Sequence, residues 1–236
     1  NIQYKMKSLV FETGVIISLV TNNLLWILPH LKKQLRGKLL LSESVKEEII
    51  NRPLKSKKFK LEALIVQDYY REGIFTLVKN KFSQKKTEEL LNLANSCFQA
   101  NGHNVKVVDR AEIETLMVVI QNKADAIVMD ERTLRLLIED PEKLEHVLST
   151  RMHTKVHLNR DNARKFQELT KGINVIRSTE LAYIAYKMKL LDKYITAKKV
   201  IDNSLRKELL EGTLWALKLN GCSIAEQEIN QILKMN

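Results

Sequence analysis

Acidic residues stand where apolar, strand-like runs end in this chain. Glu12 follows the run 8–11, and Asp130 follows the run 126–129. In two further places, acids open the segment that comes after such a run. These acids are Glu47 and Glu48 after residues 39–41, and Asp109, Glu112 and Glu114 after residues 105–108. Because sites in open parallel sheets form beyond the carboxyl ends of the strands, we expect these acids to gather at one edge.

Most of these acids, taken singly, also have a purely structural explanation. Asp130 could cap the helix that follows it, and Asp109 with Glu112 has the spacing of a capping box. Acids in a first helical turn also suit the helix dipole. Glu12 is the exception, because Glu is a weak cap and Thr13 is a better candidate beside it. We therefore expect Glu12 to have no structural role, which favours a functional interpretation of the whole set.

Carboxylates that share a site need a cation. They repel one another and raise each other's pKa unless a positive charge neutralises them. A ligand set made only of oxygen atoms favours Mg²⁺ or Mn²⁺ over Zn²⁺. Such an ion can activate water and neutralise charge on a phosphate. The acids therefore predict Mg²⁺ or Mn²⁺ as the cofactor and a phosphate ester as the substrate.

The charge balance favours a polyanionic partner. The 236 residues carry a formal net charge of +11, and the isoelectric point lies near 9.5. Such an excess suits nucleic acid first and a membrane surface second, although a solvated lysine-rich surface would give the same balance. A basic connector stands out, which is either a solvated loop or an edge that contacts phosphates of a nucleic acid. Its lysines are Lys55, Lys57, Lys58 and Lys60.

Apolar strand-like runs alternate with helical patterns along most of the chain. This alternation predicts an α/β protein, a three-layer α/β/α sandwich with a central, mainly parallel sheet. The last forty or so residues are helical only, which predicts a C-terminal helical extension. We expect one domain over residues 6–192, with an insertion around 140–172, and the extension over 193–236.

Several element boundaries are specific expectations of the sequence. We expect a helix over 15–35 with a break at Pro29, and a helix that ends before Pro53. A third helix is expected over 87–100, closed by Asn101-Gly102. Ser178 is expected to cap a helix that runs through residue 191. Ser223 with Glu226 predicts the capping box of the last helix.

Cysteine usage and hydropathy predict a cytoplasmic protein without a membrane partner. Cys97 and Cys222 lie far apart and form no Cys-x-x-Cys pair, which suits a reducing compartment. The apolar run 15–28 is too short and too polar to span a membrane.

The order and context of the acids resemble those of PIN-domain ribonucleases, and the chain is most similar to the longer archaeal members. The first matching motif is Phe11-Glu12-Thr13-Gly14, an apolar strand that ends in an acid followed by Thr and a small residue. The second is Val45-Lys46-Glu47-Glu48 in a helix. The third is Ala111-Glu112-Ile113-Glu114, and the fourth is Ala124-Asp125-Ala126 followed by an apolar strand and Asp130-Glu131.

This resemblance implies a PIN-like nuclease domain that hydrolyses RNA phosphodiester bonds. It implies Glu12, Glu48, Glu112 and Asp130 as catalytic residues and as ligands of Mg²⁺ or Mn²⁺. Auxiliary roles fall to Glu114, Asp109, Glu131 and Thr13. RNA is the expected partner, and the formation of a homo-oligomer is left open.

One residue departs from the family pattern. The first acid of the family is normally Asp, whereas this chain has Glu12, whose extra methylene moves the carboxylate by about 1.5 Å. Catalytic geometry is sensitive on that scale. The departure leaves two alternatives open, a weakened ribonuclease or a catalytically impaired RNA-binding or assembly module. A toxin of a toxin–antitoxin pair is a less favoured alternative, because the C-terminal helices have no counterpart there.

Overall fold

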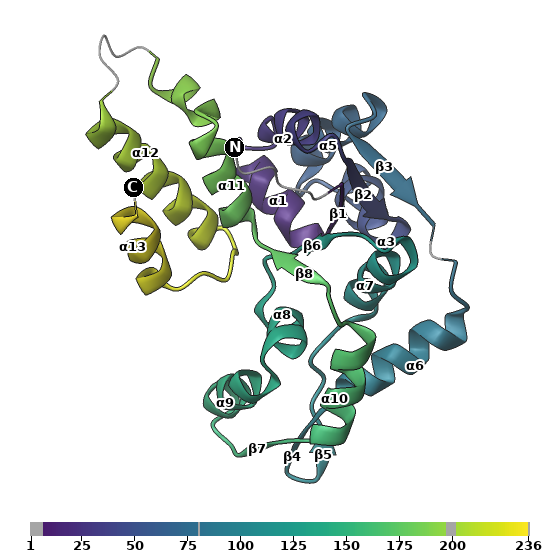
Figure 1. The fold of residues 1–236 in the computed structure, drawn as a ribbon. Coiled ribbons are helices and arrows are strands. Elements are labelled where there is room, and N and C mark those ends of the chain that lie inside the picture. Colours follow the sequence, from purple (N-terminus) through teal and green to yellow (C-terminus); the bar gives the residue numbers. More distant parts are fainter. Residues whose placement is uncertain (1–6, 80, 197–201, 236) are drawn as a thin grey trace.

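The structure is a computed structural model that describes residues 7–79, 81–196 and 202–235 (Figure 1). The expected α/β architecture is confirmed, since five strands form one parallel sheet in the order β3-β2-β1-β6-β8. The strands are β1 (Ser8–Phe11), β2 (Lys38–Ser42), β3 (Phe75–Val78), β6 (Ala126–Val128) and β8 (Asn174–Ile176).

A second, smaller sheet is antiparallel. It pairs β4 (Phe98–Ala100) with β5 (His103–Asn104) on one side and with β7 (Val156–Leu158) on the other. Figure 1 shows these three strands beyond the end of α10 (Arg160–Leu169), away from the parallel sheet. Two of the three strands lie outside the predicted insertion around 140–172, so residues from two distant parts of the chain build this sheet.

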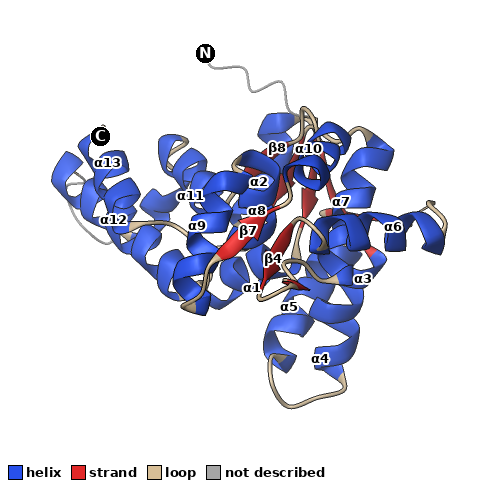
Figure 2. Ribbon diagram, turned by 90° about the horizontal axis from the view of Figure 1, so that it is seen from below, coloured by secondary structure: helices blue, strands red, loops and turns tan. Residues whose placement is uncertain are grey.

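The inner strands β1, β2 and β6 are buried on both faces of the sheet, which explains why their central residues are apolar. Successive side chains of a strand point to opposite faces. Leu9 and Phe11 of β1 accordingly belong to one hydrophobic cluster, and Val10 belongs to the other. The first cluster also contains residues of α1 (Thr13–Thr21) and α11 (Ser178–Lys187), and the second contains residues of α7 (Arg110–Asn122). Helices therefore cover both faces (Figure 2).

The C-terminal helices belong to the same core as the first face of the sheet. Leu210 and Leu214 of α12 (Asn203–Leu219) and Ile229 of α13 (Glu226–Lys234) are fully buried in the first cluster. Figure 1 shows α12 beside α11 and α13 beside α12. The remaining helices are α2 (Ile27–Leu35), α3 (Glu43–Lys46), the π-helix η1 (Glu47–Asn51), α4 (Arg52–Leu54), α5 (Lys60–Arg71), α6 (Gln84–Asn95), α8 (Arg132–Glu139), α9 (Pro141–Met152) and the 3-10 helix η2 (Leu190–Tyr194).

Two predictions that rested on proline were wrong. The break in the first helical region comes at Asn23, which has a left-handed backbone with φ of 53°, and not at Pro29. Pro29 lies in the first turn of α2, where a missing N–H removes no helical hydrogen bond. Pro53 likewise stands at the start of α4, so helical winding continues past it from the π-helix η1.

Three further boundaries also differ from the prediction. Phe98–Ala100 is strand β4 and not helix, and Asn101-Gly102 is its hairpin turn, with φ of 50° and 80°. Arg177, not Ser178, precedes α11, which ends at Lys187. Ala225 with Glu228, not Ser223 with Glu226, starts α13, because Glu228 Oε2 accepts from Ala225 N.

In the part of the chain that the structure describes, no helix is long and apolar enough to cross a membrane. The predicted start of the domain at residue 6 lies outside the described residues, as do residues 197–201 and 236 of the predicted extension.

Candidate carboxylate site

Strands β1 and β6 are neighbours, and the order of the strands reverses between them. The chain moves from β1 to β2 and β3 on one side, and then returns to β6 and β8 on the other. Ligand sites in such sheets form outside the carboxyl ends of the strands at this switch point. Glu12 lies there because its N–H continues the ladder to Val128 O at 3.0 Å, and Asp130 follows two residues beyond β6.

Glu12 has a structural role after all, contrary to the prediction. It is the N-cap of α1, and its Oε1 accepts from Gly14 N at 2.8 Å. Thr13 does not cap the helix, since its hydroxyl donates to Glu48 Oε2 at 2.6 Å. The cap uses only one oxygen of Glu12, because Oε2 is buried and has no hydrogen-bond partner. That free oxygen is available to a ligand.

Asp130, like Glu12, has one carboxylate oxygen with a hydrogen-bond partner and one without. The residue is 3% exposed, and its Oδ1 accepts from Ser178 N at 2.8 Å, whereas Oδ2 is buried without a partner. It does not cap the helix that follows, because Glu131 does so by accepting from Leu134 N at 2.7 Å. The capping explanation of Asp130 is therefore wrong.

The acids of this region act on one another electrostatically. Burial raises the pKa of Glu12 to about 7, and the charges of Asp130 and Glu131 add to the rise. Burial also raises the pKa of Glu112 to about 7, and Glu131 and Glu12 again contribute. Acids that follow β1, begin α7 and follow β6 thus form one negatively charged neighbourhood that a cation would stabilise.

The acids around the start of α7 are held mainly by their own helix. Glu112 Oε2 accepts from Asp109 N at 2.6 Å, which confirms the predicted spacing of a capping box. Asp109 is exposed and pairs with Lys106. Glu114 pairs with Arg110 at 3.0 Å, so it is engaged by a cation of its own helix. Of these three acids, only Glu112 has a pKa that burial raises and to which the charge of Glu12 contributes.

Glu48 reaches the neighbourhood through Thr13. It lies in η1, a π-helix, which is a rare element that occurs often at functional sites. The wide turn of η1 is fixed by Asn51, whose side-chain amide donates to Glu47 Oε2 at 2.6 Å. Glu47 is therefore occupied within η1, whereas Glu48 is bound to the helix that Glu12 caps.

The carboxylates do not form a ready-made metal cluster. Within residues 7–79, 81–196 and 202–235, no three His, Cys, Asp or Glu side chains lie close enough together to hold one ion. Each acid is instead anchored on a nearby N–H or hydroxyl, as expected of like charges that repel. The donor set nevertheless fits Mg²⁺ or Mn²⁺ in its chemistry, because it consists of oxygen atoms, two of them buried and unpartnered.

The basic connector lies toward the carboxyl ends of the parallel strands, as the carboxylates do. Because β2 and β3 are parallel and α5 ends at Arg71 just before β3, residues 55–60 at the start of α5 lie toward the carboxyl edge. Figure 2 shows α4 and the loop after it projecting from the body of the molecule. The four predicted RNA-binding lysines, Lys55, Lys57, Lys58 and Lys60, are all exposed.

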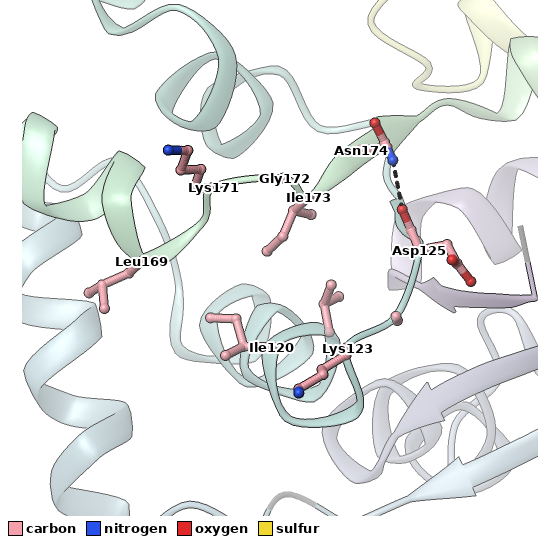
Figure 3. Close-up of a pocket in the computed structure, with 10 residues that line it drawn as sticks. Ile120, Lys123, Asp125, Leu169, Lys171, Gly172, Ile173 and Asn174 are labelled. Carbon is pink, nitrogen blue, oxygen red and sulfur yellow. Dashed lines mark hydrogen bonds between the residues drawn. The ribbon is translucent and has the colours of Figure 1, made fainter.

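A cavity of about 410 Å³ lies at the opposite end of the strands, beside the amino ends of β6 and β8. Asp125 and Asn174, which stand at the amino ends of β6 and β8, line it together with Lys123 and Lys171 (Figure 3). The Asn174 side-chain amide donates to Asp125 O at 2.9 Å. Because this cavity opens at the amino ends of the strands, it is separate from the carboxylates.

Three contributors to the site were missed in the sequence. Ser178 supplies its backbone N–H to Asp130, and Ser223 N donates to Asp130 O at 3.1 Å. Cys222 lies close enough for the charge of Asp130 to act on its thiol. The Ser-Thr pair after the last strand was a usable signal for Ser178, but nothing local marked Cys222 and Ser223, which are about ninety residues from Asp130.

Comparisons with known protein families, with curated proteins and with solved structures find no match to this chain.

Proposed function

We propose that the chain is a metal-dependent endoribonuclease that hydrolyses RNA phosphodiester bonds. The observation that supports this most directly is the pair of buried, unpartnered carboxylate oxygens, Glu12 Oε2 and Asp130 Oδ2, beyond two neighbouring strands. A buried anionic oxygen without a partner is costly, so such a pair favours the binding of a cation. The net charge of +11 supports a polyanionic substrate.

The fold we propose for this site is a PIN-like α/β/α sandwich. Its support is the strand order 3-2-1-6-8, with acids following β1 and β6 at the switch point and helices on both faces. The nuclease domain would span residues 6–192 with the insertion at 140–172, and residues 193–236 would form the extension.

The proposed roles follow from the contacts of each residue. Glu12 and Asp130 would hold Mg²⁺ or Mn²⁺ through their free oxygens, with Glu48 and Glu112 completing the set. A bound divalent ion would supply neutralisation of phosphate charge and activation of water. Without a bound cation Glu112, whose pKa is raised to about 7, exchanges its proton near neutral pH, and a bound divalent ion would favour its ionised form. The exposed connector lysines would orient the RNA backbone toward this edge.

A second candidate function has two observations in its favour. Among the described residues, no three His, Cys, Asp or Glu side chains lie close enough to hold one ion, and one oxygen of Glu12 is already hydrogen-bonded to the N-terminus of its own helix. Both facts suit an RNA-binding or assembly module that has lost cleavage. That module would bind RNA in a salt-sensitive manner without a metal requirement.

The deciding experiment is cleavage of an unstructured, end-labelled RNA with increasing Mn²⁺. We expect the parent chain and a Glu12→Asp variant to cleave, and Asp130→Asn to cleave at least about 100-fold more slowly. Asp161→Asn, an exposed acid of α10, is the matched control and should cleave like the parent. RNA binding is measured separately with and without a chelator.

Two outcomes separate the candidates. Mn²⁺-dependent cleavage that disappears in Asp130→Asn supports the nuclease. If neither the parent nor Glu12→Asp cleaves, and RNA binding is equal with and without Mn²⁺, the nuclease proposal fails and the binding module is supported.

A further inference from the structure

The segment that joins α12 to α13 lies directly on Asp130. We call residues 221–225 the C-terminal clasp. Ser223 N donates to the backbone oxygen of Asp130 at 3.1 Å, which links positions about ninety residues apart. The acid itself is 3% exposed, so the clasp helps to cover it. The C-terminal helices therefore contact the carboxylate site through backbone and do not merely pack beside it.

Two arginines hold the clasp in this position. The carbonyl oxygen of Ser223 accepts from Arg177 at 3.2 Å and from Arg135 at 3.4 Å. Charge-assisted hydrogen bonds of this kind are stronger than neutral ones. The central residue of the clasp, Ser223, thus donates its N–H to Asp130 and accepts at its carbonyl from two guanidinium groups, so its backbone is held on both sides.

Arg177 joins the clasp to two helices, α11 and α13. Its guanidinium pairs with Glu180 of α11 at 2.6 Å and with Glu228 of α13 at 3.1 Å, while its side chain is 12% exposed. Partial burial would raise the pKa of Glu228, but the hydrogen bond from Ala225 N and the charge of Arg177 lower it below its ordinary value. The ion pair therefore favours the docked position of α13.

Cys222 of the clasp lies beside Asp130. The thiol is buried, and its sulfur lies 3.8 Å from the hydroxyl oxygen of Thr179. Burial and then the charge of Asp130 raise the pKa of Cys222 to about 12, so the thiol stays protonated beside the acid. A neutral group at this point excludes water from Asp130 without adding a second charge.

We propose that the C-terminal clasp fixes the carboxylate of Asp130 in its ligand-ready position, with Arg177 and Glu228 as the positioning residues that hold the clasp. The C-terminal helices are thereby a working part of the carboxylate site. The consequence for metal binding rests on the proposed function, whereas the consequence for the position of Asp130 does not.

The test uses the amide proton of Ser178 as a reporter, because that N–H is hydrogen-bonded to Asp130 Oδ1. Glu228→Lys places a cation against Arg177, and Glu226→Lys makes the same change of charge on an exposed residue of the same turn. We expect Glu228→Lys to speed hydrogen exchange of Ser178 and Ser223 by about fivefold or more relative to the amides of β1. Glu226→Lys should leave both rates unchanged.

A milder variant and a Mn²⁺ titration complete the test. Glu228→Gln keeps an acceptor for Ala225 N and is used if Glu228→Lys fails to fold. If Ser178 and Ser223 exchange no faster than in the parent, the clasp proposal is overturned, whatever Mn²⁺ does. If exchange rises and the parent binds no Mn²⁺, the clasp is supported and the metal site fails. If the parent binds Mn²⁺, faster exchange and weaker Mn²⁺ binding in the Glu228 variant support the clasp and the metal site together. Faster exchange with unchanged Mn²⁺ affinity overturns the link between the clasp and the position of the Asp130 carboxylate.

Discussion

Glu12 combines two tasks that oppose each other. Its Oε1 caps α1, which favours the ionised carboxylate, while burial and the nearby acids favour the protonated form. The second influence wins, because the pKa is raised from 4.5 to about 7. The structural and the functional explanations of this residue are therefore compatible, since each uses a different oxygen.

The raised pKa of Glu12 makes the stability of the metal-free protein depend on pH. Between pH 4.5 and about 7 the folded chain binds this proton more tightly than the unfolded chain does. The stabilising contribution is thus complete below pH 4.5 and is lost as pH rises through 7. We expect Glu12→Gln to raise the free energy of unfolding by roughly 1–3 kcal/mol at pH 8 and to change it little at pH 4.

Urea unfolding of metal-free protein at the two pH values measures this effect. Glu226→Gln, which changes an exposed acid, serves as the control and should shift stability equally little at both. A Glu12→Gln variant that is less stable than the parent at pH 8 would show that the ionised carboxylate is well accommodated without a cation.

Gly14 leaves room for the Glu12 carboxylate. A Cβ at this position would lie 3.0 Å from Glu12 Oε2 and 3.3 Å from Oε1. Because the crowded atoms end a flexible side chain, Gly14→Ala should displace the carboxylate at little cost. We expect Mn²⁺ affinity to fall about tenfold, while stability is kept or rises by up to about 1 kcal/mol from better helix propensity.

Gly212→Ala provides the comparison for this substitution. Gly212 also lies in a helix, α12, but an added Cβ there would meet nothing within 4 Å. It should gain similar stability with no change in Mn²⁺ affinity, measured by titration and thermal unfolding. Equal Mn²⁺ affinity in both alanine variants would argue against Glu12 as a ligand.

At the scale of elements, the buried strands were the predictable part of the fold. Runs such as 39–41 are apolar throughout because helices cover both faces of the sheet. Strand β4 was mistaken for the end of a helix, because Phe98 and Ala100 continue an apolar helical pattern. It becomes a strand by pairing with β7, which lies about sixty residues further along the chain and leaves no local trace.

The candidate site was predictable in the same limited sense. The acids after β1 and β6 could be found because each follows a strand, and strand ends share an edge in a parallel sheet. Their partners could not be found, because Ser178 and Ser223 act through backbone N–H groups that any residue except proline would supply. The orientation of Glu112 toward its own N-cap was visible only as a capping pattern.

The link between α1 and η1 gives a prediction at this scale. The Thr13 hydroxyl donates to Glu48 Oε2 at 2.6 Å. This hydrogen bond links the π-helix η1 to α1, the helix that Glu12 caps. Thr13→Val keeps the shape and removes the donor, so Glu48 is no longer oriented. We expect Mn²⁺ affinity to fall about tenfold, as measured by titration, and Thr13→Ser to restore it. Failure of the serine variant to rescue would assign the loss to packing.

At the scale of the whole molecule, the proposed nuclease requires the positive charge and the carboxylates to cooperate, since the acids alone would repel RNA. The connector at residues 55–60 offers exposed lysines on the carboxylate side of the sheet, and Lys58 lies 4.9 Å from the centre of the Phe59 ring. Exposed apolar side chains continue along the same face of α5, with Leu61 68% exposed. This combination suits contact with phosphates and with unstacked bases.

Salt dependence of RNA binding measures how much of the charge acts at this connector. Each phosphate contact to a single strand contributes about 0.7 to the slope of log K against log salt. Replacing the four connector lysines with Gln should therefore reduce the magnitude of the slope by about 2 to 3, because four exposed cations are removed from the RNA path. Binding is measured in an Asp130→Asn background with a chelator, so that cleavage does not interfere.

A control chain loses the same charge at four exposed lysines outside the connector, Lys123, Lys155, Lys165 and Lys171. If the two chains lose equal slope, the RNA follows net charge and not the connector, and the proposed path from α5 to the carboxylates is wrong.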